Sequence, residues 1–137
     1  AALDTRIRCS IPIAGSLPLY LRSGGSVGDL EQFEPEFYRI AGYPALYVLG
    51  AQGKRRVQVQ LLNRRDDCCF GEGQHDAARG GLPYEEAIRE YEKRVQERLR
   101  LLGAGQFRVV IDETAPSHMI SHRAIEDVLL PTLRGCR

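Results

Sequence analysis

The chain has 137 residues, of which 43% are hydrophobic and 27% are charged. This length and balance are those of one globular domain with its own core, which excludes a fibrous or largely disordered protein. Nineteen Lys and Arg residues against eighteen Asp and Glu residues give a net charge of +1, so no overall field draws the molecule onto nucleic acid or an anionic membrane. Its apolar runs are far shorter than the roughly 18 residues that indicate a membrane span. We therefore expect a single domain over residues 1–137 with no membrane partner.

The first third of the chain predicts a β-hairpin followed by a helix. Apolar and polar side chains alternate over residues 6–13, as in a half-buried strand, and the alternation resumes over residues 17–22 after a short link that contains glycine. Helical spacing follows up to Ile40, with Ser26 or Asp29 as the capping residue. Pro35 must either kink this helix or lie in its first turn.

The remainder predicts a second hairpin, a loop and a helix-strand-helix segment. Residues 45–50 and 57–62 read as the two strands of the hairpin, and residues 63–82 as a long polar loop. A long amphipathic helix is expected from Pro83 to Leu102, a buried strand over residues 107–113, and a C-terminal helix that Pro131 disturbs.

The resulting order, ββαββαβα, is typical of an α+β domain rather than of repeated parallel βαβ units. The opening hairpin, the helix start "SVGDL" and the strand at residues 45–50 resemble the β-grasp fold of the ubiquitin-like superfamily. The resemblance covers residues 5–62 and implies a mixed sheet in which residues 107–113 lie beside the first strand; residues 83–137 then form an extension. Pro12 departs from the pattern and must lie at a strand end or bulge. A ferredoxin-like βαββαβ arrangement is the alternative, if the first two strands are one bent strand.

The stretch "RRDDCCFGEGQHD" at residues 64–76 carries carboxylates, thiols and an imidazole, all of which can bind zinc. Adjacent cysteines are expected to point in different directions, and no Cys-x-x-Cys pair completes a tetrahedral site, so a solvated loop is the expectation. Without a visible secretory signal, the four cysteines are expected to be free thiols in an intracellular, cytoplasmic protein. A thiol activated by a nearby cation is a further interpretation.

A second candidate site lies in "SHMISH", where two histidines are four residues apart, as in helical zinc sites. If Ser121 caps the last helix, however, His118 precedes that helix and the two rings do not share a face. The alternative hypothesis is thus a small metal-dependent or thiol enzyme with zinc as its cofactor. Its candidate ligands are His118, His122, Asp112, Cys68 and His75.

The leading hypothesis is a noncatalytic protein-interaction or scaffold/adaptor module without a cofactor, because no complete catalytic set is evident. Its partner would be another protein or a second copy of the chain. The sequence has neither a phosphate loop nor a ribonucleoprotein-like aromatic motif, which argues against nucleotides and nucleic acid. Basic residues next to the strand at 57–62 would form the partner surface. These are Lys54, Arg55, Arg56 and Arg64.

Overall fold

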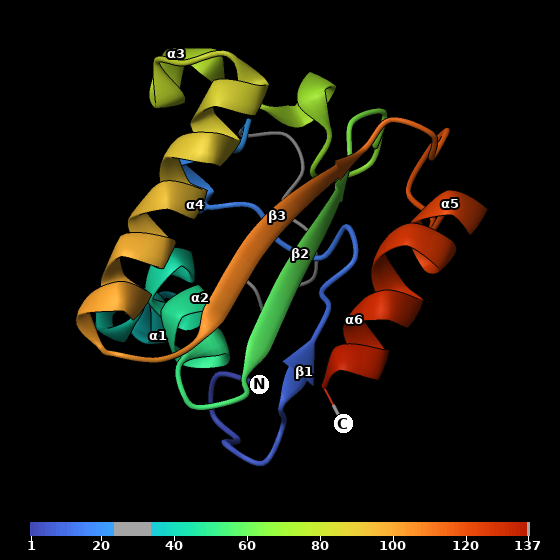
Figure 1. Ribbon diagram of the computed structural model, residues 1–137. Coiled ribbons are helices and arrows are strands. Elements are labelled where there is room, and N and C mark those ends of the chain that lie inside the picture. The colour runs from blue at the N-terminus through green and yellow to red at the C-terminus, as the bar shows by residue number, and fades with distance from the viewer. Residues whose placement is uncertain (24–33, 137) are drawn as a thin grey trace.

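The computed structural model describes residues 1–23 and 34–136 and shows a mixed α and β protein built on an open parallel sheet (Figure 1). The sheet has three strands in the order β1-β2-β3, namely Cys9–Ser10, Val57–Asn63 and Gln106–Asp112. The longer helices are α1 (Pro35–Ile40), α2 (Tyr43–Ala51), α4 (Tyr84–Leu101) and α6 (Leu130–Gly135). The shorter ones are η1 (Leu19–Leu21), η3 (Glu72–Gln74), α3 (Ala77–Gly80), α5 (His122–Ala124) and η4 (Ile125–Leu129).

Helices cover both faces of the sheet (Figure 1). Helices α2 and α4 pack on one face, where Leu62 and Val109 join the side chains of Tyr47, Tyr91 and other residues in the main apolar core. The run α5-η4-α6 lies against the other face. A parallel sheet buried on both faces explains why six of the seven residues of β2 are buried, including polar ones.

The polar side chain of Gln60 is fully buried in the middle of β2 and is satisfied by the helix layer. Its Nε2 donates to the carbonyl and the hydroxyl oxygen of Ser16, and its Oε1 accepts from the Tyr91 hydroxyl at 2.9 Å. The Tyr47 hydroxyl lies 3.3 Å from Nε2. Because an unpaired buried amide is costly, this network favours one register of β2 against α2 and α4.

Both expected hairpins are wrong. Residues 45–50 lie inside α2, where Tyr43, Tyr47 and Ala51 recur every four residues and are all buried, so the apolar run belongs to a buried helix. Residues 17–22 contain η1 rather than a strand, and Cys9 pairs in parallel with Val57. Pro12 lies after the end of β1. Its carbonyl accepts a hydrogen bond from the Leu61 amide at 2.9 Å, and the amide hydrogen that proline lacks is not needed there.

The sheet order of the described residues therefore differs from both expected topologies. All pairs between the three strands are parallel, whereas the β-grasp reading required antiparallel pairing of the first two strands. The ferredoxin-like alternative placed the first strand beside both residues 107–111 and the third strand. In this sheet β2 lies between β1 and β3, so β1 does not pair with residues 107–111. Long-range parallel pairing was missed because alternation along one strand says nothing about the direction of its partner.

Other expectations are confirmed. Helix α4 buries the expected stripe from Tyr84 to Leu99, whereas Leu102, expected at its end, is exposed. Strand β3 closely matches the expected strand. Pro35 is the first residue of α1; the expected helix start at Ser26 or Asp29 lies outside the described residues. The last helix begins after Ser121, and its π-helical stretch η4 ends shortly before Pro131, which has no amide to donate. In the part of the chain that the structure describes, no helix is long and apolar enough to cross a membrane.

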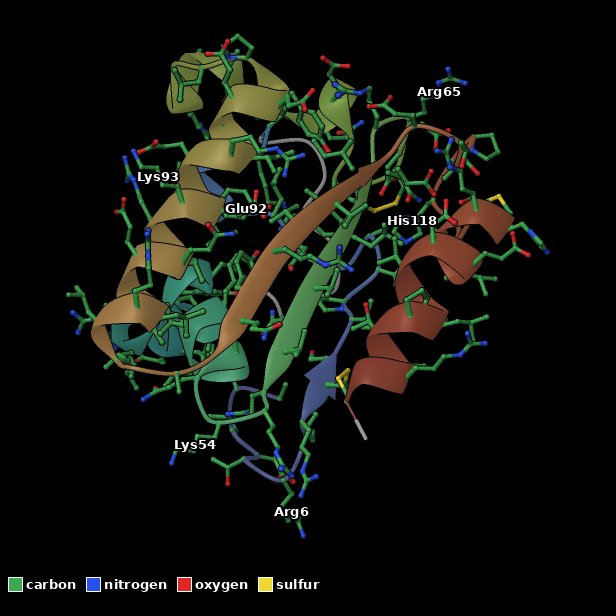
Figure 2. All side chains as sticks on the ribbon, in the orientation of Figure 1. Arg6, Lys54, Arg65, Glu92, Lys93 and His118 are labelled. Atoms are coloured by element: carbon green, nitrogen blue, oxygen red, sulfur yellow. A yellow bond between two sulfur atoms is a disulfide. The ribbon has the colours of Figure 1, made fainter. Side chains whose placement is uncertain are left out.

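The outer edge of β3 is covered by polar side chains of α4. Glu92 Oε1 accepts from the Val109 amide at 2.7 Å, Arg89 donates to the Val109 carbonyl at 2.8 Å, and Gln96 donates to the Phe107 carbonyl at 3.1 Å. Figure 2 shows Glu92 between α4 and the strand. These bonds satisfy backbone groups that a sheet edge otherwise presents to another chain.

A disulfide joins the two ends of the described chain, from Cys9 in β1 to Cys136 after α6, over a sequence separation of 127 residues. The remaining two cysteines, Cys68 and Cys69, are joined to each other. The expectation of free thiols is wrong, since none of the four cysteines is free. The intracellular, cytoplasmic location rested partly on free thiols and stays a prediction.

The contact between α4 and the sheet edge can be tested with Glu92→Ala. Loss of the carboxylate leaves the Val109 amide buried without an acceptor, so the free energy of unfolding should fall by about 1.5–3 kcal/mol in urea denaturation. Glu97→Ala, an exposed change on the same helix, should cost less than about 0.5 kcal/mol. Equal losses in the two variants would show that the edge contact does not stabilise the fold.

The long-range disulfide can be tested with the double variant Cys9→Ser/Cys136→Ser. Opening so large a loop raises the entropy of the unfolded chain, so the free energy of unfolding should fall by about 2–5 kcal/mol. The matched control is Cys68→Ser/Cys69→Ser, which opens almost no loop and should cost less than about 1 kcal/mol. A larger loss in the control than in the Cys9/Cys136 variant would contradict this assignment.

Candidate metal centre

The candidate centre lies where two neighbouring parallel strands end. Strand β2 ends at Asn63 and β3 at Asp112, and these two residues pair with each other. The loops that follow, residues 64–76 and 113–121, therefore start from the same edge of the sheet. In open parallel sheets this carboxyl edge is where ligands bind. Figure 2 shows His118 beside this edge, next to a disulfide.

Asp66 is the buried anchor of the centre, with a side chain that is 0% exposed. Its Oδ1 accepts hydrogen bonds from the backbone amides of Cys68 and Cys69, each at 3.0 Å. Its Oδ2 lies 2.9 Å from His118 Nδ1, across 52 positions of sequence. One carboxylate thus both shapes the cysteine turn and orients the imidazole of the second loop.

The second loop is held on both sides of His118. Asn63 is fully buried, and its Nδ2 donates to the Ser117 carbonyl at 2.9 Å and to the Met119 carbonyl at 2.6 Å. These two carbonyls flank His118 in the sequence. The end of the loop is held by Ser121, whose hydroxyl donates to Asp112 Oδ2 at 2.5 Å. The position of His118 therefore depends on polar residues at the ends of both long strands.

Four ligand-type side chains meet at this edge: Asp66, Cys68, Cys69 and His118. One donor atom from each lies within 4.8 Å of the others, and the four comprise a carboxylate oxygen, two sulfurs and an imidazole nitrogen. Asp66 and Cys69 are buried, whereas Cys68 and His118 are exposed. The centre thus has a closed floor and an open outer side.

The two sulfurs are joined in a disulfide between neighbouring residues. The expectation that Cys68 and Cys69 point apart is therefore wrong: the turn held by Asp66 brings the two sulfurs together. Metal ions bind the thiolate form of cysteine, so the two sulfurs can offer ligand atoms only when the disulfide is reduced.

The structure brings together two of the five residues predicted as metal ligands, Cys68 and His118. His122 instead lies 3.5 Å from Glu126 on the exposed side of its helix turn, with Ser121 as the cap that separates it from His118. His75 contacts the Leu82 carbonyl through Nε2 at 2.9 Å. Asp112 accepts hydrogen bonds from the second loop.

Asp66 and Cys69 complete the cluster; they lie in the stretch whose carboxylates and thiols can bind zinc, but they are not among the five named ligands. A sequence signal for them exists, because an aspartate two and three residues before two cysteines can accept their amide protons and turn the chain. The pairing of Asp66 with His118 has no such local signal.

The predicted basic partner surface is divided between the two ends of β2. Lys54 and Arg55 are exposed before the strand, but Arg56 is only 6% exposed and donates to several backbone carbonyls, including those of Ile7 and Leu49.

Arg64 lies at the other end of β2 and forms ion pairs with three glutamates. Its hydrogen bonds, first among them that to Glu113, raise the pKa of Arg64. Strand β2 is also the central strand of the described sheet and not an edge. Of the four residues, Lys54 and Arg55 thus remain candidates for a partner surface.

Comparisons with protein families, with curated proteins and with solved structures found no match to this chain. The ubiquitin-like resemblance, the function and the partner of the chain therefore stay predictions.

The loop contact at Asp112 predicts a pH dependence of stability. Burial alone would raise the pKa of this carboxyl group, but hydrogen bonds from Ser121, Thr114 and the Ala115 amide together hold it below the ordinary value of 3.8. The charged form is thus favoured in the folded state, so its contribution is present above about pH 4 and is lost as the pH falls through the lowered pKa.

Asp112→Asn should therefore reduce the free energy of unfolding by about 2 kcal/mol at pH 6, and its difference from the parent protein should shrink below about pH 4. Urea titrations between these pH values measure this. The exposed Asp127→Asn is the control and should lower the free energy of unfolding by less than about 0.5 kcal/mol at pH 6. A constant difference at all pH values would contradict the charged hydrogen bonds at Asp112.

Proposed function

We propose that this protein binds one thiophilic divalent cation of the zinc class at Asp66, Cys68, Cys69 and His118. The observation that carries the proposal is the convergence of four donor atoms within 4.8 Å. They come from two loops at the carboxyl edge of a parallel sheet, and separate buried groups hold each loop. Structural convergence of this kind, rather than ligand spacing along the chain, supports a metal centre.

The donor set favours zinc over harder cations. Two thiolates and an imidazole suit zinc and other thiophilic ions, whereas magnesium and calcium prefer oxygen ligands. The contact between Asp66 and His118 Nδ1 is the carboxylate-histidine arrangement that orients imidazoles towards metals, and it leaves Nε2 as the nitrogen available to an ion. Cys68, Cys69 and His118 would then be the ligands, with Asp66 as the orienting group.

Three protein ligands with an open side are typical of catalytic rather than structural zinc. Cys68 and His118 are exposed, so the open side faces solvent. This supports a small metal-dependent enzyme, in which the bound ion would activate water or polarise a substrate oxygen. The residues of the chain supply the binding, the orientation of the imidazole and the closed floor.

Metal binding and the Cys68–Cys69 disulfide exclude each other. A dithiol reductant would transfer two electrons to the disulfide, break its sulfur-sulfur bond and become a disulfide itself. Two protons would pass to the Cys68 and Cys69 sulfurs, and the cation would displace them on binding. The proposed centre is therefore a property of the reduced protein.

The noncatalytic interaction module expected from the sequence is the second candidate. Exposed Lys54 and Arg55 favour it, because neither forms an ion pair with a carboxylate among the described residues. Free positive charge on a surface steers acidic protein partners. A reduced protein that binds no metal would leave this module as the function to pursue.

Metal titration of the phosphine-reduced protein tests the metal proposal. Zinc should bind at one equivalent per chain in competition with a chromophoric chelator, and Co²⁺ should give thiolate charge-transfer absorption. Cys68→Ser, Cys69→Ser and His118→Ala should each weaken binding by more than about tenfold, and Asp66→Asn by about 10–100-fold. Far-ultraviolet circular dichroism checks the fold of each variant.

The matched controls are His122→Ala and His75→Ala, which should bind zinc as the parent protein does. Oxidised protein should bind none at this centre. The proposal would be overturned if the reduced, folded protein bound no stoichiometric zinc. It would also be overturned if His122→Ala weakened zinc binding as much as His118→Ala does.

A further inference from the structure

A second hollow lies at the opposite end of the strands, away from the cysteine-histidine centre. It is a groove of about 580 Å³ between the C-terminal helix α6 and the amino-terminal halves of β2 and β3. Val57 and Pro131 supply apolar surface to the groove, and Arg55, Arg108 and Thr132 supply polar groups. This volume is within the range of about 300–1,000 Å³ that small-molecule sites occupy.

The groove carries uncompensated positive charge. Among the residues that the structure describes, no aspartate or glutamate lines it. Among residues 1–23 and 34–136, neither Arg55 nor Arg108 takes part in an ion pair. The guanidinium of Arg108 donates to the Thr132 hydroxyl at 3.3 Å, so it lies against the helix wall. By contrast, the charge of Arg64 at the other end of β2 is compensated by ion pairs with three glutamates.

The walls of the groove are held in place by a disulfide and by hydrogen bonds to backbone carbonyls. The Cys9–Cys136 disulfide ties the end of α6 to β1, and Cys9 Sγ also lies 3.6 Å from the Thr132 carbonyl. Arg55 has a φ of 62°, a left-handed conformation that is uncommon for residues other than glycine. Its neighbour Arg56 is anchored by hydrogen bonds to backbone carbonyls, which keep this turn in place. A preformed site loses less entropy on binding than a mobile one.

We propose that this groove binds a small amphiphilic anion, with an oxyanion headgroup at Arg55 and Arg108 and an apolar body over Val57 and Pro131. Guanidinium groups donate paired hydrogen bonds to carboxylate and phosphate oxygens alike. The headgroup chemistry is therefore an oxyanion of either kind. The proposal does not depend on the proposed metal centre, which lies at the opposite, carboxyl ends of β2 and β3.

Isothermal titration of the full chain with four probes tests the proposal: hexyl phosphate, hexanoate, hexanol and inorganic phosphate. At least one of the two amphiphilic anions should bind at 1:1, and hexanol and inorganic phosphate should each bind at least about tenfold more weakly. Binding of hexyl phosphate alone assigns a phosphate headgroup, and binding of hexanoate alone assigns a carboxylate. Both results support the groove as an anion site.

Arg55→Gln and Arg108→Gln should each weaken binding of the amphiphilic anion by at least about fivefold, and added salt should weaken it further. Arg98→Gln, an exposed change on α4 in the other helix layer, should leave it unchanged. Binding of hexanol as tight as that of the anions would overturn the proposal, as would inorganic phosphate binding as tightly. An Arg98→Gln variant that loses as much affinity for the anion as the Arg55→Gln and Arg108→Gln variants would also overturn it. So would the absence of binding of either anion to protein with a native circular dichroism spectrum.

Discussion

Burial of the central strand β2 is the constraint on which the rest of the structure depends. The strand is covered by helices on both faces and carries polar side chains into the interior, where each needs a partner. Gln60 finds its partners in Ser16, Tyr47 and Tyr91, which ties the strand to the helix layer. Asn63 donates to two carbonyls of the loop after β3. One strand therefore sets both the core packing and the position of His118.

The two ends of the sheet carry different chemistry because the strands are parallel. Their carboxyl ends share one edge, which collects Asp66, the two adjacent cysteines and His118. Their amino ends share the other, where Arg55 and Arg108 line a groove against α6. An antiparallel sheet would have mixed strand starts and strand ends at each edge. Strand direction thus separates the proposed metal centre from the proposed anion groove.

The two disulfides differ in their physical consequence. The Cys9–Cys136 bond closes nearly the whole chain and fixes the end of α6 against β1, so it restricts the unfolded state. The Cys68–Cys69 bond joins neighbours and removes almost no chain entropy. Its significance is therefore chemical, because the same two sulfurs are either bonded to each other or available as ligands beside Asp66 and His118.

The sequence by itself determined the elements whose pattern is long and local: α4 from its apolar stripe, β2 from its alternation, β3 from its apolar run, and the last helix from its cap at Ser121. It also identified Cys68 and His118 as possible ligands. Tertiary structure alone decided that residues 43–51 form a helix, because a short apolar run fits a buried helix and a strand equally well. It also decided the parallel pairing of the strands and the contact of Asp66 with His118, 52 positions away, since such contacts depend on how separate elements pack.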